Sequence, residues 1–164
     1  MELFAFAMKM EKDGEQYYRD LSSKTKNDGL KVILTMMADA EVKHYNVLKE
    51  MSEEAGQPVF AEDTVLKDAK NVFQQMQENR HGIDMSNEMS YVALYKEALD
   101  IESRSKEFYL EKADAVQGQE QKEIFLRLAE EEKRHMVLIN TIIDFVTRPD
   151  NWLENAEWYH LDEY

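Results

Sequence analysis

Apolar side chains recur every three or four residues over most of the 164-residue chain, a spacing that places them on one face of an α-helix. Four long stretches carry the pattern, at residues 2–26, 30–56, 84 or 86 to 116, and 120–146. Polar or glycine-containing turns separate the stretches, the first of them at residues 24–29. Gly56 and Pro58 end the second stretch, and Pro149 ends the fourth. The pattern therefore predicts an all-α protein with four long helices.

Two further segments lie outside these stretches. Residues 57–85 form a long connection, and apolar positions at helical spacing predict a shorter helix within it, over residues 62–78. A long crossover is typical of four-helix bundles whose second and third helices run parallel. The tail, residues 148–164, is rich in aromatic residues, including Trp152 and Trp158. We expect a bundle over residues 1–147, with the tail packed on it or on a partner subunit.

Charged residues interrupt the apolar face of each long helix. The second and fourth stretches each contain a Glu-x-x-His motif within the apolar stripe, formed by Glu41 with His44 and by Glu132 with His135. Residues three apart share a helix face, so each motif directs a carboxylate and an imidazole toward the same part of the core. The first and third stretches are interrupted by one glutamate each. These are Glu11 and Glu102.

The interrupting residues follow an internal repeat. Glu11 and Glu102, Glu41 and Glu132, and His44 and His135 are each separated by 91 positions. Residues of the surrounding stripes repeat at the same offset. These are Ala7 and Ala98, Tyr18 and Tyr109, Ile33 and Ile124, and Ala38 and Ala129. The chain therefore reads as two copies of one helical hairpin, each supplying one Glu and one Glu-x-x-His motif.

Four glutamates and two histidines in the core of a four-helix bundle form the ligand set of a two-metal carboxylate site. Uncompensated, each buried carboxylate would cost several kcal/mol or take up a proton, whereas two divalent cations balance four carboxylates. Oxygen and nitrogen ligands favour iron or manganese, with zinc as an alternative. By position, Glu41 and Glu132 would bridge the metals, and Glu11 and Glu102 would be terminal ligands. The competing interpretation is a repeated hairpin whose buried charges form salt bridges or hydrogen bonds.

Other residues lie close to this constellation in the pattern. Tyr18 and Tyr109 lie two turns after the terminal glutamates and are candidates to hydrogen-bond metal-bound carboxylates, with an ordinary core role as the alternative. Gly14 and Ser105 lie three residues after those glutamates and would leave room beside the metals or let the helices approach closely. Two further histidines lie outside the repeat, and we expect a solvated or structural role for both. They are His81 and His160.

Net charge, cysteine content and hydropathy exclude several functional classes of protein. The formal net charge of −14 argues against nucleic-acid binding, which needs clustered basic residues. The sequence contains no cysteine, so disulfides, thiolate metal sites and cysteine nucleophiles are excluded within these residues. No apolar run approaches membrane-spanning length, and residues 1–6 lack the basic start of a signal peptide. We expect a cytoplasmic protein that binds neither nucleic acid nor membrane.

At Glu11, Glu41, His44, Glu102, Glu132 and His135 the chain resembles the ferritin-like superfamily, closest to rubrerythrin-type di-iron carboxylate proteins, over about residues 1–147. The resemblance implies a ferritin-like bundle, a di-iron centre reacting with dioxygen or peroxide, and a homodimer or larger assembly. Rubrerythrins carry a second glutamate three residues beyond the third-helix ligand, where this chain has Ser105, and usually a cysteine-ligated rubredoxin domain. The electron donor is therefore expected to be a separate protein.

The sequence thus predicts a di-iron oxidoreductase of the oxidase or peroxidase type, in which the reduced metals pass electrons to dioxygen or peroxide. Two alternatives belong to other classes. An iron-storage protein without turnover would need a hollow shell of many subunits. A structural module braced by metal would have a closed, redox-silent site, with zinc as its expected occupant.

Overall fold

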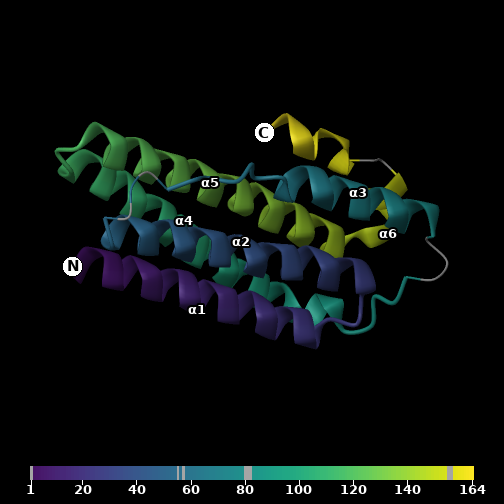
Figure 1. The fold of residues 1–164 in the computed structure, drawn as a ribbon. Helices are drawn as coiled ribbons and strands as arrows, with labels where there is room; N and C mark the ends of the chain where they lie inside the picture. The colour runs from purple at the N-terminus through teal and green to yellow at the C-terminus, as the bar shows by residue number, and fades with distance from the viewer. Residues whose placement is uncertain (1, 55, 57, 80–82, 155–156) are drawn as a thin grey trace.

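All the secondary-structure elements in the described part of the chain are helices. The computed structural model describes residues 2–54, 56, 58–79, 83–154 and 157–164, and this part contains no β-strand. Four long helices dominate it (Figure 1). They are α1 (Glu2–Lys24), α2 (Asp28–Ser52), α4 (Val92–Ala115) and α5 (Gln119–Thr147). The predicted all-α, ferritin-like bundle is confirmed.

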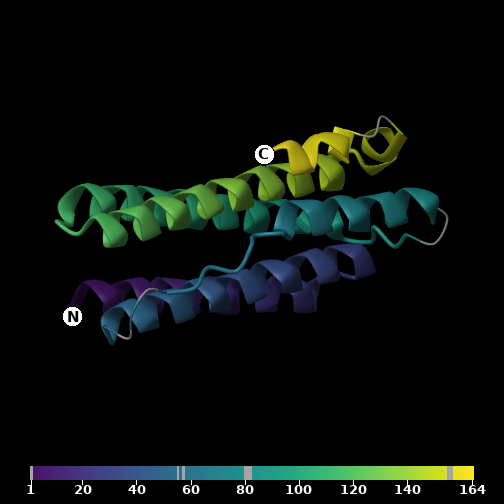
Figure 2. The same cartoon turned by 45° about the horizontal axis from the view of Figure 1, so that its top comes forward.

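The long helices form two hairpins, α1 with α2 and α4 with α5. Figure 2 shows one hairpin lying below the other, with the segment after α2 crossing between them. This crossover leads into the shorter helix α3 (Val65–Glu78) and returns the chain to the end at which α2 began. As a result α2 and α4 run parallel, as the long connection predicted (Figure 1).

The first turn is shorter than predicted. We expected residues 24–29 to be a turn, but α2 already begins at Asp28, because the Asn27 side chain accepts a hydrogen bond from the backbone nitrogen of Leu30 at 2.8 Å. Gly29 is therefore inside the helix, not in the turn. A Cβ atom at Gly29 would lie 2.3 Å from the terminal methyl of Met76, so this glycine lets α3 approach α2 closely.

Other boundaries also differ from the predicted ones. Helix α2 ends at Ser52 instead of residue 56, and Glu54 beyond it has the left-handed φ of 51°. Helix α3 begins at Val65 instead of residue 62, because the Asp63 carboxylate accepts from the backbone nitrogen of Val65 at 3.2 Å. A short 3₁₀-helix, η2 (Glu88–Tyr91), precedes α4. The predicted loop histidine, His81, lies outside the described residues.

The tail contains two short helices that the sequence pattern did not predict, α6 (Pro149–Glu154) and η3 (Glu157–Glu163). Both contact α3 and α5. The Trp152 ring lies 4.5 Å from the Phe73 ring and 5.4 Å from the Phe145 ring, measured between centroids. Proline has no N–H to pair in the first helical turn, so Pro149 can begin α6 after ending α5. Division of the chain into a bundle and a separate tail remains a prediction.

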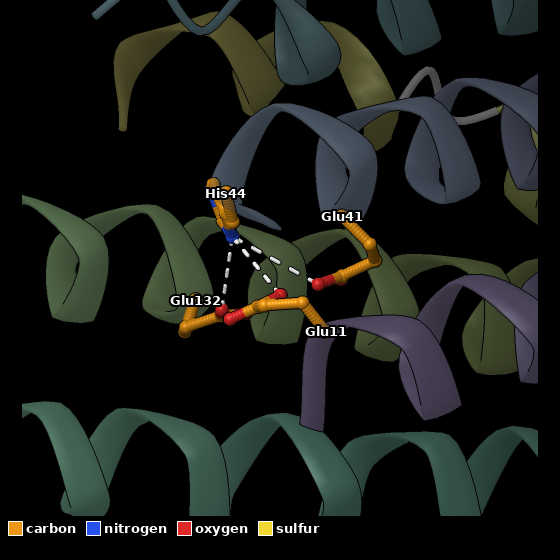
Figure 3. A group of neighbouring side chains, drawn as sticks. All are labelled: Glu11, Glu41, His44 and Glu132. Atoms are coloured by element: carbon orange, nitrogen blue, oxygen red, sulfur yellow. Dashed lines mark hydrogen bonds and ion pairs between the residues drawn. The ribbon is translucent and has the colours of Figure 1, made fainter. Parts of the chain in front are cut away.

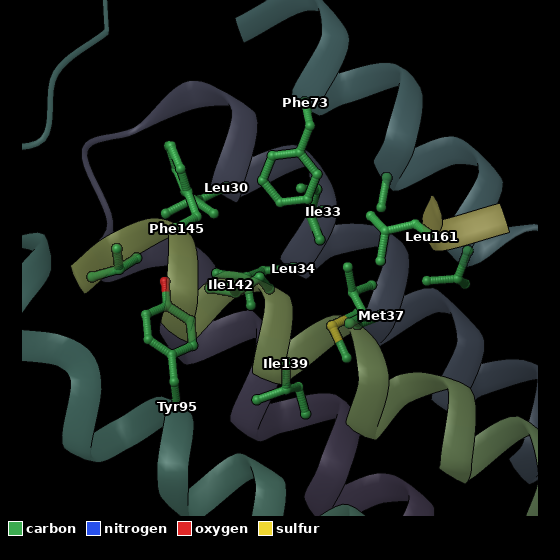
Figure 4. Close-up of a cluster of buried hydrophobic side chains, with 14 of the residues drawn as sticks. Leu30, Ile33, Leu34, Met37, Phe73, Tyr95, Ile139, Ile142, Phe145 and Leu161 are labelled. Carbon is green, nitrogen blue, oxygen red and sulfur yellow. The ribbon is translucent and has the colours of Figure 1, made fainter. Parts of the chain in front are cut away.

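The core consists of two apolar clusters. The larger cluster gathers side chains from all the long helices, from α3 and from the tail, including Leu34, Phe73 and Ile142 (Figure 4). The smaller cluster lies toward the other end of the bundle and includes Leu48, Tyr109 and Phe125. Along every long helix, the glutamates and histidines of the repeat fall between residues of the two clusters. A charged layer therefore crosses the middle of an apolar core.

Every helix in the described residues is too short or too polar to span a bilayer.

Candidate metal centre

The charged layer contains the six residues predicted as ligands, and each residue is at most 3 % exposed. They are Glu11, Glu41, His44, Glu102, Glu132 and His135. Each long helix carries one or two of them on the face that points into the bundle. Within the described residues they form two groups of potential ligands, in each of which the donor atoms lie within 4.8 Å of one another. The fold thus brings the predicted ligand set together.

The first group surrounds Nδ1 of His44 (Figure 3). This nitrogen lies 3.1 Å from Glu132 Oε1, 3.5 Å from Glu11 Oε2 and 3.8 Å from Glu41 Oε2. The Glu-x-x-His spacing puts Glu41 and His44 on one face of α2, while Glu11 comes from α1 and Glu132 from α5. Three helices therefore direct donors at one point.

The second group surrounds Nδ1 of His135 in the same manner. This nitrogen lies 3.4 Å from both Glu41 Oε1 and Glu102 Oε1, and 3.5 Å from Glu132 Oε2. The two groups share Glu41 and Glu132, whereas Glu102 and His135 belong to the second alone. Shared carboxylates at the centre and one unshared Glu and His on each side form the arrangement expected of two bridged metal ions.

Crowding of the carboxylates changes their proton affinity when no cation balances them. Burial, together with repulsion from the neighbouring carboxylates, raises the pKa of Glu41 well above its usual range and that of Glu132 to about 8. Burial acts in the same direction on Glu102, but the charge of His135 and hydrogen bonds to the carboxylate outweigh it and lower the pKa to about 2. The shared carboxylates therefore hold protons wherever cations do not replace them.

The imidazoles respond to the same field. Burial disfavours the charged form of both rings, but the carboxylates around them outweigh it, principally Glu132 for His44 and Glu102 for His135. The pKa of each histidine consequently lies well above its usual value. Two protonated carboxyls and two imidazolium rings would balance the layer in the way that two divalent cations do.

Several buried atoms of the layer favour a cation over a purely hydrogen-bonded network. Among the described residues, Glu41 Oε1, Glu132 Oε2 and both ring nitrogens of His135 are buried and make no hydrogen bond. Buried polar atoms are seldom left unpaired. A cation beside Nδ1 of His135 would satisfy that nitrogen and the two carboxylate oxygens, and oxygen with imidazole nitrogen suits iron, manganese or zinc. The residues present therefore fit a pair of metal ions.

Two tyrosines connect the hairpins at this layer. Tyr18 on α1 donates a hydrogen bond to Glu102 on α4, and Tyr109 on α4 donates one to Glu11 on α1. Burial and the adjacent carboxylate charge raise the pKa of both phenols well above the usual value, so both remain protonated donors. Each tyrosine thus holds the unshared carboxylate that belongs to the opposite hairpin.

One buried carboxylate at the centre was not predicted. Glu131 is 7 % exposed, and its Oε2 accepts a hydrogen bond from Nε2 of His44 at 2.7 Å. It lies within the run Glu130–Glu132 on α5, where composition alone makes it look like one more solvated charge. The repeat contains the signal that could have revealed it, because the position 91 residues earlier is Ala40, a buried apolar residue.

The remaining candidates lie at the edge of the centre or away from it. A Cβ atom at Gly14 would lie 3.4 Å from Cδ of Glu41, so α1 passes close to a shared carboxylate, while the repeat-related Ser105 is half-buried. His160 is exposed in η3, and its ring contacts Glu163 at 3.0 Å, far from the layer in the sequence and outside both ligand groups.

A comparison with protein-family models matches the rubrerythrin family over residues 2–77 and 94–158. The chain belongs to the rubrerythrin family. The matched segments contain all six residues of the two ligand groups, together with Glu131 and both tyrosines. No curated protein and no solved structure matched the chain in the corresponding searches. Family membership and the buried cluster together indicate a metal-binding protein with a di-metal centre.

Proposed function

We propose that the chain holds two iron ions and is an oxidoreductase that reacts with dioxygen or peroxide. The observation that carries the proposal is the pair of buried ligand groups sharing Glu41 and Glu132. Glu11 and His44 would complete the site of one ion, and Glu102 and His135 that of the other. Four carboxylates balance two divalent cations, which removes the electrostatic cost of the buried layer.

An iron pair, when bound, supplies redox chemistry that can deliver electrons to dioxygen or peroxide. Reduction of hydrogen peroxide to two waters consumes two electrons and two protons, and we assign the electrons to a separate donor protein. The chain's own residues provide the setting for this chemistry. The phenols of Tyr18 and Tyr109 hold the carboxylates of Glu102 and Glu11, and apolar clusters lie on either side of the charged layer.

The first experiment measures the metal content of protein purified without oxygen, and then its absorption spectrum as peroxide and afterwards oxygen are added. We expect two irons per chain and new near-ultraviolet bands that form rapidly with one of the oxidants. Zinc, or no spectral response after iron loading, would overturn the oxidoreductase and favour the metal-braced module. A hollow multi-subunit shell in light scattering would favour storage, whereas we propose a cytoplasmic homodimer.

The ligand assignment has its own test. Glu41→Ala and Glu132→Ala each remove a carboxylate shared by both groups, so each variant should lose binding of the metal pair. Glu130→Ala is the matched control, because Glu130 is exposed on the same helix as Glu132. Stoichiometric binding of two metals by either test variant would refute the assignment.

A further inference from the structure

The hydrogen bond between His44 and Glu131 distinguishes the two halves of the centre. Nδ1 of His44 faces the carboxylates of its ligand group, and Nε2 on the opposite side of the ring lies 2.7 Å from Glu131. An imidazole that donates Nε2–H to a carboxylate keeps Nδ1 free as a metal ligand, and its ring is held in one orientation. In the neutral ring that would bind a metal, Glu131 therefore fixes both the tautomer and the direction of His44.

Glu131 is itself held from the other side. Nε of Arg127, one turn earlier on α5, lies 3.5 Å from Glu131 Oε1. The same guanidinium donates to the backbone oxygen of Ala61 at 3.1 Å and lies 4.2 Å from the centroid of the Phe60 ring. Glu131 thus lies between His44, to which it is hydrogen-bonded, and Arg127, with which it forms an ion pair. Glu131 and His44 both line a pocket of about 240 Å³.

His135 has no equivalent support. The repeat relates Glu131 to Ala40, whose methyl group cannot accept a hydrogen bond. Among the residues that the structure describes, neither ring nitrogen of His135 makes a hydrogen bond. The ligands of the two groups are thus the same in kind, but only one histidine is oriented by a carboxylate behind it.

We infer that Glu131 is a positioning residue for His44, and that it makes the two metal sites unequal, so that the site with His44 fills first. Residues that orient a metal-binding histidine typically change metal affinity 10- to 100-fold when they are replaced. The inference rests on the proposed metal centre and adds an order of loading to it. It requires two steps of metal binding in the natural chain.

Anaerobic titration of the chelator-treated protein with Co²⁺, in competition with a chromophoric chelator, measures both affinities. The wild type should bind two ions in separate steps. Glu131→Ala should weaken the tighter step about 10- to 100-fold and leave the weaker step unchanged. Glu131→Gln keeps the size of the side chain and a neutral acceptor, so its affinity in the tighter step should lie between those of the wild type and Glu131→Ala. Glu130→Gln on the same helix is the control.

A second readout follows the imidazoles by ¹H–¹⁵N correlation during addition of Zn²⁺. At one equivalent the ring signals of His44 should shift before those of His135, and the Nε2–H of His44 should resist solvent exchange. Glu131→Ala should remove that protection while circular dichroism shows an intact helical fold. This readout is independent of any turnover by the iron-loaded protein.

The outcomes separate the two proposals. A wild-type protein that binds no pair of metals would overturn the proposed function and, with it, this inference. Two ions bound with equal affinity, or an unchanged tighter step in Glu131→Ala, would overturn the positioning role alone. Equal weakening of both steps in Glu131→Ala would also overturn it, since the effect would not belong to His44.

Discussion

The α1–α2 hairpin and the α4–α5 hairpin present the same ligands but support them differently. Each contributes two glutamates and one histidine at a constant offset, and each sends a tyrosine to the terminal glutamate of the other. They differ beside the ligands, where Ala40 corresponds to Glu131 and Gly14 to Ser105. Repetition of the hairpin thus preserves what would touch the metals, while the surroundings of the two sites have diverged.

The largest expected difference between the two sites comes from removing a glutamate that belongs to only one ligand group. Glu11 and Glu102 each belong to one ligand group only, so Glu11→Ala and Glu102→Ala should each reduce metal content from two ions per chain to one. Metal analysis after dialysis against a weak chelator checks the stoichiometry. Loss of both ions in either variant would mean that the two sites cannot be occupied separately.

Removal of the metals should expose a pH dependence to which both hairpins contribute. The pKa values of Glu41, Glu132 and both histidines are raised in the fold, so the folded state binds more protons than the unfolded chain. This stabilisation is complete below the unfolded pKa values and is lost as pH rises through the folded ones. The lowered pKa of Glu102 acts only below about pH 4.5, where its stabilisation is lost on acidification.

The unfolding free energy of the chelator-treated protein should therefore fall by a few kcal/mol as pH rises from about 5 to 8, at about 1.4 kcal/mol per unit of pKa shift. Its melting temperature should fall with it. Binding of two divalent ions should flatten this slope, because they replace the protons. Thermal melts across that range, with and without Zn²⁺, check the expectation. A melting temperature that rises with pH in the metal-free protein would contradict it.

Removing the buried tyrosine hydroxyl should destabilise the protein equally in the two hairpins. Tyr18→Phe and Tyr109→Phe each remove a donor to a buried carboxylate, at an expected cost of about 1.5–3 kcal/mol in unfolding free energy. Tyr17→Phe is the control, because Tyr17 donates to a backbone oxygen of Leu94 near the surface, at 2.6 Å. Denaturant unfolding that gave unequal losses for the two buried tyrosines would show that the hairpins differ here as well.

The smallest expected change in stability is at Gly14 and Ser105, three residues after Glu11 and Glu102. Gly14→Ala should stabilise α1 by up to about 1 kcal/mol, because the added Cβ meets Glu41 at an ordinary contact distance and alanine favours helix. Ser105→Ala, in the related position of α4, should change stability by less than about 0.5 kcal/mol. If Gly14→Ala instead lost a metal in analysis by mass spectrometry, the space beside Glu41 would be part of the site.

Periodicity was enough to predict the long helices and the charged layer, because burial of one helix face is a local property of the sequence. The start of α2 was missed because Gly29 suggested a turn, whereas the Asn27 cap and the packing of Met76 decide where the helix begins. The tail helices depend on the surface that α3 presents to Trp152. Glu131 depends on the arrival of His44 from another helix, which no pattern within α5 reports.

Neither hairpin contains a complete ligand group. The first group takes Glu132 from α5, and the second takes Glu41 from α2, so each group is assembled only when the hairpins dock. Each hairpin can form from contacts that are local in the sequence, so we expect docking to be the later event. Bound cations would therefore act mainly on the reverse process. They should slow unfolding many-fold while leaving the folding rate almost unchanged, so bound metals would raise the kinetic stability of the protein.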